Sequence, residues 1–250
     1  MSPLIQHQIE IERNRKAWES KPLLRRIYAQ FYESIRTLID PMIGGTIVEI
    51  GSGIGNLKEH VPGAVCTDLF PNPWLDLVCD GYRLPFRDKS VSHLVLFDVF
   101  HHLQAPGAFL KEAKRVLTSL GRVILFEPYI SVTSFPVYGL LHHEPVGWLK
   151  PIDVLVSPPK NEYYAAQGNA TRLFFRSENA EFMRDWRVVS ASTYSAFSYI
   201  FSGGYSKPAF YPMTLFAALN WLDARLSRWP RVFGSRCLVG LTPVQRGKDA

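Results

Sequence analysis

Residues 47–56, with the sequence IVEIGSGIGN, decide the fold of this chain. Apolar strand-forming residues come first, with Glu49 among them, and glycine then occupies every second position from 51 to 55. Such a run is typical of a buried parallel strand followed by a tight turn and the start of a helix. Glycine adopts backbone angles that a Cβ forbids, and it lets a ligand approach the main chain. The stretch therefore predicts a strand, a binding turn and a helix N-terminus with free N–H groups.

Strand and helix patterns alternate along the first half of the chain. We expect strands at 64–68, 75–80, 91–98 and 121–128, and helices at 5–18, 22–39 and 106–117. Alternating strands and helices predict a parallel sheet with helices on its faces.

The chain is less regular beyond Pro128. Residues 186–192 predict a sixth strand, residues 234–241 a seventh, and residues 211–228 a helix between them. The intervals before and after the sixth strand are longer than ordinary connections, so we interpret them as insertions.

Composition limits the class of protein. The 250 residues fit one sizeable α/β domain, and 47% apolar residues are ample for its core. No apolar run is long enough for a membrane span, and the N-terminus lacks the pattern of a secretory signal. Three cysteines without CxxC spacing indicate buried thiols in a reducing compartment, so the cytoplasm is expected.

The net charge of +6 and a pI of about 9.2 permit an anionic partner. The positive residues are scattered, however, and this favours a solvated basic face. The stretch 211–229, with Trp221 and Trp229, could also rest on a membrane surface.

Acidic residues end two of the expected strands. Asp68 follows Gly51 by 17 positions, where nucleotide-binding α/β units place the acid that accepts hydrogen bonds from ribose hydroxyls. Asp80 begins the string DGYRLPF, in which a carboxylate acceptor is followed by apolar residues.

Three motifs in the same order resemble one known family. E-x-G-x-G-x-G at 49–55 resembles motif I of the class I S-adenosylmethionine-dependent methyltransferases. D-x-x-x-L-P-F at 80–86 is similar to the adenine-binding loop of the type-11 methyltransferase group, and HHL at 101–103 with GRVILFEP at 121–128 resembles the same group. The similarity runs without a break from residue 46 to residue 128.

The resemblance implies a three-layer Rossmann-like α/β fold. Its sheet would have seven mostly parallel strands with an antiparallel last strand, N-terminal helices, and insertions before and after the sixth strand. We expect a single domain over residues 1–250, with a helical cap at 1–43, a cofactor-binding half at 44–128, and acceptor-site insertions with the last strands at 129–250.

The resemblance also implies S-adenosylmethionine as the cofactor and assigns residues to it. Glu49, Gly51 and Gly53 would contact the methionine moiety, Asp68 the ribose, and Asp80 the adenine. The implied cofactor-binding set also includes Leu69, Gly81 and Phe97.

Methyl transfer is an in-line displacement, for which a hydroxyl or amine acceptor also needs a base. The candidate catalytic residues are His101, His102 and His143; the alternative for the first two is a packing role at the start of a helix. We expect no metal, because adjacent histidines such as His142 and His143 point in different directions in regular structure.

The expected function is methylation of a small-molecule, glycan or lipid-precursor acceptor, with oxygen, nitrogen and carbon all open as the methylated atom. A nicotinamide oxidoreductase is an alternative, but Asn56 stands where its third glycine would be. A non-catalytic cofactor-binding subunit is a second alternative. No nucleic-acid partner is expected, because Phe97-Asp98-Val99-Phe100 replaces the motif of amino-methylating DNA enzymes. The oligomeric state is not predicted.

Overall fold

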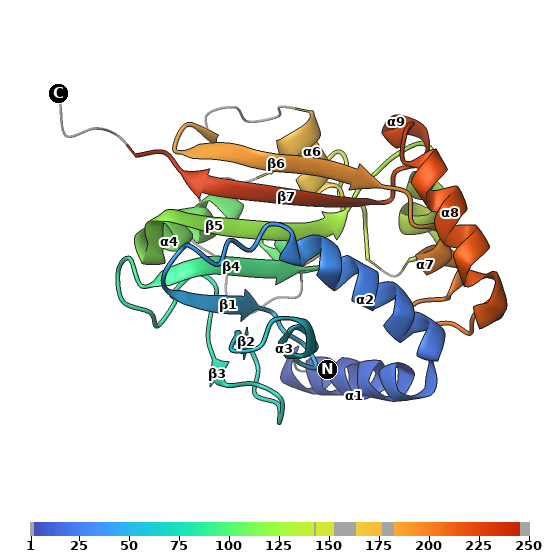
Figure 1. Cartoon of the computed structure of the whole chain (residues 1–250), viewed down its shortest axis with the longest axis horizontal. Helices are drawn as coiled ribbons and strands as arrows, with labels where there is room; N and C mark the ends of the chain where they lie inside the picture. The colour runs from blue at the N-terminus through green and yellow to red at the C-terminus, as the bar shows by residue number, and fades with distance from the viewer. Residues whose placement is uncertain (1–2, 143, 153–163, 177–182, 246–250) are drawn as a thin grey trace.

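The computed structural model describes residues 3–142, 144–152, 164–176 and 183–245. Seven strands form one sheet in the order β3-β2-β1-β4-β5-β7-β6, with helices on both faces (Figure 1). The strands are β1 (Thr46–Ile50), β2 (Val65–Asp68), β3 (Leu77–Val78), β4 (Val91–Phe97), β5 (Leu117–Pro128), β6 (Trp186–Tyr194) and β7 (Arg236–Pro243). Strands β1 to β5 pair in parallel, whereas β7 is antiparallel to both β5 and β6. The predicted Rossmann-like fold with an antiparallel last strand is confirmed.

The helices between these strands are mostly short. They are α1 (Pro3–Ser20), α2 (Pro22–Arg36), α3 (Leu57–His60), α4 (Pro106–Val116), α5 (Ser134–Pro136), α6 (Asn169–Phe175), α7 (Phe197–Phe201), α8 (Phe216–Leu226) and α9 (Pro230–Phe233), with tighter or wider turns at η1 (Phe100–His102), η2 (Val137–Leu141) and η4 (Met213–Leu215). The helix after the glycine turn has a single turn, because Pro62 and Gly63 follow it closely. The helix expected over 211–228 is divided into η4 and α8.

Two hydrophobic clusters hold the layers together, one on each face of the sheet. On one face α4 packs Phe109, Leu110 and Ala113 against the apolar side chains of β4 and β5. On the other face α2 packs Ile27, Phe31 and their helical neighbours against Phe97 and Phe126. All seven residues of β4 are buried, as a central parallel strand covered on both faces requires.

The strand order identifies the edge of the sheet at which a ligand is expected to bind. The chain leaves β1 toward β2 on one side and reaches β4 on the other, so the connections diverge at the carboxyl ends of β1 and β4. Open α/β sheets bind ligands at such a switch point. The glycine turn follows β1, and Asp98 with the η1 turn follows β4, so both predicted motifs lie at this edge.

Within the described ranges, every helix is too short or too polar to cross a bilayer. Trp221 and Trp229 are more than half exposed, and the Arg225 guanidinium stacks over the Trp221 ring. The predicted contact of this stretch with a membrane surface stays a prediction. All three cysteines are buried free thiols, as expected.

A buried histidine in β4 should make stability depend on pH. His93 is 1% exposed, and its Nε2 accepts a hydrogen bond from the Asp40 backbone N–H at 3.1 Å. Burial, assisted by Arg122, lowers the pKa of His93 to about 4. His93 therefore binds a proton near pH 6.5 in the unfolded chain but only near pH 4 in the native state. The contribution of neutral His93 to the free energy of unfolding is complete above pH 6.5 and is lost as the pH falls toward 4.

We predict that His93→Gln removes this dependence, because an amide oxygen still accepts the Asp40 N–H but does not titrate. Between pH 7 and pH 5 the wild type should lose about 1–2 kcal/mol more unfolding free energy than the variant. Urea unfolding at both pH values measures this difference. Equal losses in the two proteins would contradict the assignment.

Candidate active site

The glycine turn after β1 has the backbone that its sequence predicts. Gly51, Gly53 and Gly55 have φ values of +69°, +54° and +74°, in the left-handed region. A Cβ built on Gly51 would lie 2.4 Å from Val99 Cγ2. The turns after β1 and β4 are therefore in direct contact, and only glycine fits between them.

Asp68 lies above this turn. Its Oδ2 accepts a hydrogen bond from the Gly53 N–H at 3.0 Å, and its Oδ1 accepts one from the Leu69 N–H at 2.7 Å. Burial raises the pKa of Asp68, while His7 and these N–H groups oppose the shift. The structure thus brings the acid predicted to bind ribose to the turn predicted to bind the cofactor.

Helix α1, part of the helical cap expected at 1–43, lies beside the same turn, but the sequence did not indicate which of its residues face the turn. His7 Nε2 lies 3.9 Å from Asp68 Oδ1, and the His7 ring packs on Phe70. Among the described residues this buried nitrogen has no hydrogen-bond partner. A buried polar atom without a partner is rare in a native protein, and a ligand that bonds to it removes the cost. This orphaned atom and the glycine turn fit a nucleoside cofactor.

The other predicted cofactor residues lie around this edge in different settings. Asp80 is half-buried and its Oδ1 accepts the Tyr82 N–H at 2.9 Å, whereas Leu69 is half exposed. Gly81 lies against Ile50 and Phe109, and the Phe97 ring stacks on Tyr28 inside the core. Their cofactor contacts stay predictions.

Glu49 is almost completely buried behind the turn. The Cys66 thiol donates to Glu49 Oε2 at 3.5 Å. Burial raises the pKa of Glu49 to about 8, and hydrogen bonds from Ser52 and Cys66 only partly offset this. A neighbouring cation would favour the ionised form.

Glu127, at the end of β5, organises the other half of the site. This carboxylate is completely buried and accepts hydrogen bonds from the backbone N–H groups of Val99, Phe100 and His101, at 2.8, 2.6 and 3.3 Å. Its Oε2 also pairs with His101 Nδ1 at 2.7 Å. One carboxylate therefore fixes both the η1 turn and the ring of His101.

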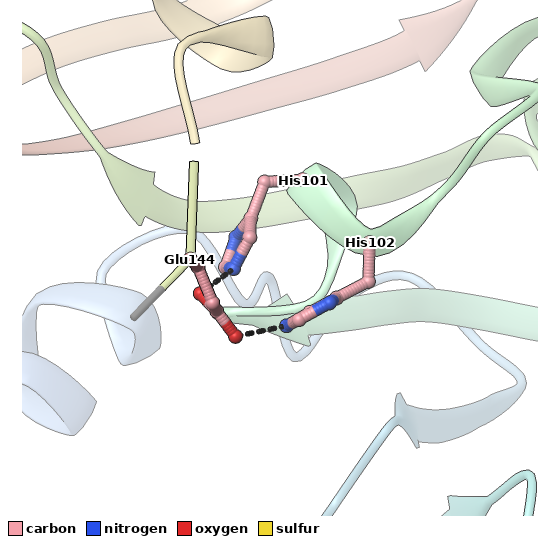
Figure 2. A group of neighbouring side chains, drawn as sticks. All are labelled: His101, His102 and Glu144. Atoms are coloured by element: carbon pink, nitrogen blue, oxygen red, sulfur yellow. Dashed lines mark ion pairs between the residues drawn. The ribbon is translucent and has the colours of Figure 1, made fainter. Parts of the chain in front are cut away.

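Three side chains converge beside this turn (Figure 2). His101 Nε2 lies 3.3 Å from Glu144 Oε2, and His102 Nε2 lies 3.4 Å from Glu144 Oε1. The two imidazoles are tilted and their centroids are 4.2 Å apart. Glu144 comes from the insertion after β5 and directly follows the histidine pair 142–143 in the sequence. The site therefore joins His101 and His102 with a residue beside the second pair of histidines. His143 lies outside the described residues.

The two histidines hold protons differently. Burial alone would lower the pKa of His101, but Glu127 and Glu144 outweigh it and raise the value to about 10. Burial and the neighbouring His101 lower the pKa of His102. Near neutral pH, His101 is a cation held between two carboxylates and His102 is neutral.

A buried ion pair completes the edge. Asp98 has a φ of +56°, which turns its carboxylate toward Arg236 at the start of β7, and the two side chains are in close contact. The Arg236 guanidinium lies 4.7 Å from the centroid of Tyr199 and also faces Phe31 and Phe126. Its Nε has no hydrogen-bond partner among the described residues.

Sequence reasoning missed His7, Glu127 and Arg236 as members of the site, and also Gln167, whose Nε2 donates to Glu144 Oε2 at 2.7 Å. Glu127 and Arg236 carried a usable signal, since each is a charged residue at the end of an otherwise apolar strand. His7 and Gln167 carried none, because only the packing of α1 and of the insertion brings them to the site.

Comparison with known proteins identifies a methyltransferase domain in part of this chain. The family described as "Methyltransferase domain" matches residues 48–125, from β1 into β5. A search of curated proteins found no significant match.

Solved structures share the fold. A structure of the complex between the Haloferax volcanii Trm112 methyltransferase activator and a putative methyltransferase matches with a TM-score of 0.54 and 18% identity, over 98% of this chain and 99% of that chain. Geranyl diphosphate C-methyltransferase from Streptomyces coelicolor A3(2), with Mg²⁺, geranyl diphosphate and S-adenosyl-L-homocysteine, matches with a TM-score of 0.53 and 13% identity, over 88% and 82%. A geranyl diphosphate methyltransferase in complex with SAM matches with a TM-score of 0.51 and 14% identity, over 88% and 90%.

Residues 48–125 therefore form a methyltransferase domain, and the chain shares its fold with solved methyltransferases. The two geranyl diphosphate methyltransferase structures contain S-adenosyl-L-homocysteine and SAM, respectively.

The contact between the two turns gives a stability prediction. Gly51→Ala should destabilise the protein by about 2–4 kcal/mol, because it adds a clash with Val99 to the cost of a left-handed alanine. In a Val99→Ala background the cost should fall to about 1–2 kcal/mol. Chemical denaturation of the four proteins measures both values.

Gly63→Ala is the matched control, since Gly63 has a φ of +87° and open space around its Cβ position. Its cost should be independent of residue 99. The steric explanation is wrong if Val99→Ala reduces the destabilisation caused by neither glycine substitution, or if it reduces the destabilisation caused by both.

The Glu127 carboxylate gives a second prediction. Glu127→Gln leaves one acceptor oxygen for several N–H donors, so the unfolding free energy should fall by about 3 kcal/mol. Glu19→Gln, which changes an exposed carboxylate on α1, should leave the unfolding temperature unchanged. Similar unfolding temperatures for both variants would refute an anchoring role for Glu127.

Proposed function

We propose that this protein methylates a small-molecule acceptor, glycan or lipid precursors included, by in-line displacement at the cofactor's methyl group. The observation that carries this proposal is the contact between the glycine turn after β1 and the turn after β4 that leads to His101. An acceptor beside the histidine cluster would lie at the same sheet edge as the cofactor, as direct methyl transfer requires.

S-adenosylmethionine, the proposed cofactor, would supply an electrophilic methyl group on its sulfonium. Asp68 would accept hydrogen bonds from the ribose hydroxyls, with His7 Nε2 as a second polar contact. Asp80 would accept from the adenine amino group. Gly51 and Gly53 would leave room for the methionine moiety, whose amino group would favour the ionised form of Glu49.

The acceptor-side residues are proposed to be His101, His102 and His143, together with Glu144. His101 holds its proton near neutral pH, so it would orient and stabilise charge rather than accept a proton. His102 Nε2 and Glu144 Oε1, which lie 3.4 Å apart, would contact the acceptor directly. The segment 129–250, which supplies Glu144, would shape the rest of the acceptor site.

The kind of acceptor is supported by chemistry on the same edge. Arg236, buried among aromatic rings with an unbonded Nε, supports an organic acceptor that carries an acidic or hydrogen-bond-accepting group. Geranyl diphosphate, the ligand of the Streptomyces structure, is one compound of this kind. The buried free thiols support a reducing compartment, and we propose the cytoplasm.

Calorimetric titration with S-adenosylhomocysteine and with NAD tests the cofactor proposal. We expect micromolar affinity for S-adenosylhomocysteine, no binding of NAD, and at least a tenfold loss of affinity in Asp68→Ala. Asp88→Ala is the matched control, because Asp88 is an exposed carboxylate that ion-pairs with Arg115 away from the turn and should not affect binding.

Three outcomes decide between the alternatives. Binding of NAD alone would favour a nicotinamide oxidoreductase. Failure of a well-folded sample to bind either compound would overturn the cofactor proposal. Binding of S-adenosylhomocysteine without turnover across a panel of small-molecule acceptors would favour a cofactor-binding subunit that needs a partner, as the activator complex from Haloferax volcanii illustrates for that protein.

A further inference from the structure

We propose that His101, His102 and Glu144 form a binding site for a single divalent transition-metal ion of the zinc type. This inference departs from the sequence expectation of no metal and does not rest on the proposed function, because the site is defined by its own ligands. One ligand atom from each side chain lies within 4.8 Å of the other two (Figure 2).

The separations fit a metal centre. Two ligand atoms at about 2.0–2.1 Å from a tetrahedral zinc lie about 3.3–3.4 Å apart. The nitrogen–oxygen separations in the cluster are 3.3 Å, for His101 Nε2 and Glu144 Oε2, and 3.4 Å, for His102 Nε2 and Glu144 Oε1. A cation placed among these atoms therefore needs only small side-chain adjustments.

Hydrogen bonds from Nδ1 fix the orientation of both imidazole rings. His102 Nδ1 lies 2.8 Å from the backbone carbonyl oxygen of Tyr164, which only accepts, so Nδ1 carries the proton. With the proton on Nδ1, the ring directs Nε2 toward Glu144 Oε1 at 3.4 Å, so a cation between these two atoms would have a ligand on each side.

His101 has a carboxylate in the corresponding place. Its Nδ1 pairs with Glu127 Oε2 at 2.7 Å, so an incoming cation displaces the proton on Nε2, and the lone pair of that nitrogen then faces the ion beside Glu144. Histidine ligands of metals usually donate their second N–H to a carboxylate or a carbonyl, and here one histidine has each kind of partner.

Glu144 is held in place by a neighbouring amide. Gln167 Nε2 donates to Glu144 Oε2 at 2.7 Å, and the Glu144 backbone N–H donates to His142 Nδ1 at 3.2 Å. Ligating carboxylates are commonly oriented by such hydrogen bonds. His102 is part-exposed at its outer face, so an ion can reach the site.

The donor set selects the kind of metal. Two imidazole nitrogens and one carboxylate suit Zn²⁺, Mn²⁺ or Fe²⁺, whereas Mg²⁺ and Ca²⁺ prefer oxygen donors. Three protein ligands leave coordination positions open, as in catalytic rather than structural zinc sites. The site borders the turn after β4, so an acceptor oxygen could bind an open position and be polarised there.

Metal binding to the chelator-treated full chain tests the proposal without cofactor or acceptor. Calorimetry with Zn²⁺ should show one equivalent bound, and Co²⁺ should produce visible ligand-field absorption. His102→Gln and Glu144→Gln should each weaken Zn²⁺ binding at least tenfold and reduce the Co²⁺ bands. His60→Gln is the matched control, since this histidine stacks on Tyr32 outside the cluster, and it should bind as the wild type does.

Nitrogen-15 NMR of the histidines in the wild type gives a readout that needs no variant. Saturating Zn²⁺ should shift the Nε2 resonances of two imidazoles while their Nδ1 sites stay protonated. Absence of binding by folded wild type, unchanged affinity in both cluster variants, or shifts confined to other histidines would each overturn the proposal. S-adenosylhomocysteine binding is measured separately, so failure of either proposal is distinguishable from failure of the other.

Discussion

The completely buried carboxylate of Glu127 determines the geometry of the carboxyl edge of this sheet. A charge in an apolar interior is stable only when hydrogen bonds satisfy its oxygens, and the N–H groups of the η1 turn supply these bonds. The same carboxylate orients His101, which in turn faces Glu144. Placement of the η1 turn, the histidine cluster and the insertion that carries Glu144 therefore depends on one group at the end of β5.

The parallel sheet brings two kinds of chemistry to one edge. Acidic residues near the carboxyl ends of β1 and β2 surround a glycine turn that suits a nucleoside, and polar residues after β4 and β5 surround a position for a second molecule. Val99 touches the glycine turn, so the two halves are separated by a single side chain. This closeness supports the proposed direct transfer between a bound cofactor and a bound acceptor.

Much of the cofactor side could be predicted from sequence because its determinants are local. The spacing of glycines in 51–55 and the acids at 68 and 80 are properties of short segments, and each lies near the sheet edge that the strand pattern predicts. The expectation for the histidines was less complete. The candidates His101 and His102 lie together in the site, but their meeting with Glu144 depends on an insertion whose path has no sequence pattern.

By itself, the sequence determined the fold class, the sheet edge that carries the glycine turn and the residues that flank this turn. These features follow from backbone periodicity and glycine spacing, which act over a few residues. Only the tertiary structure decided which charged groups meet: His7 with Asp68, Asp98 with Arg236, and Glu144 with two histidines. These contacts join residues far apart in the chain. The charge states and orientations of these side chains depend on their burial and on their neighbours, which are set only when the layers pack. A local sequence pattern therefore does not encode the charge states or the orientations.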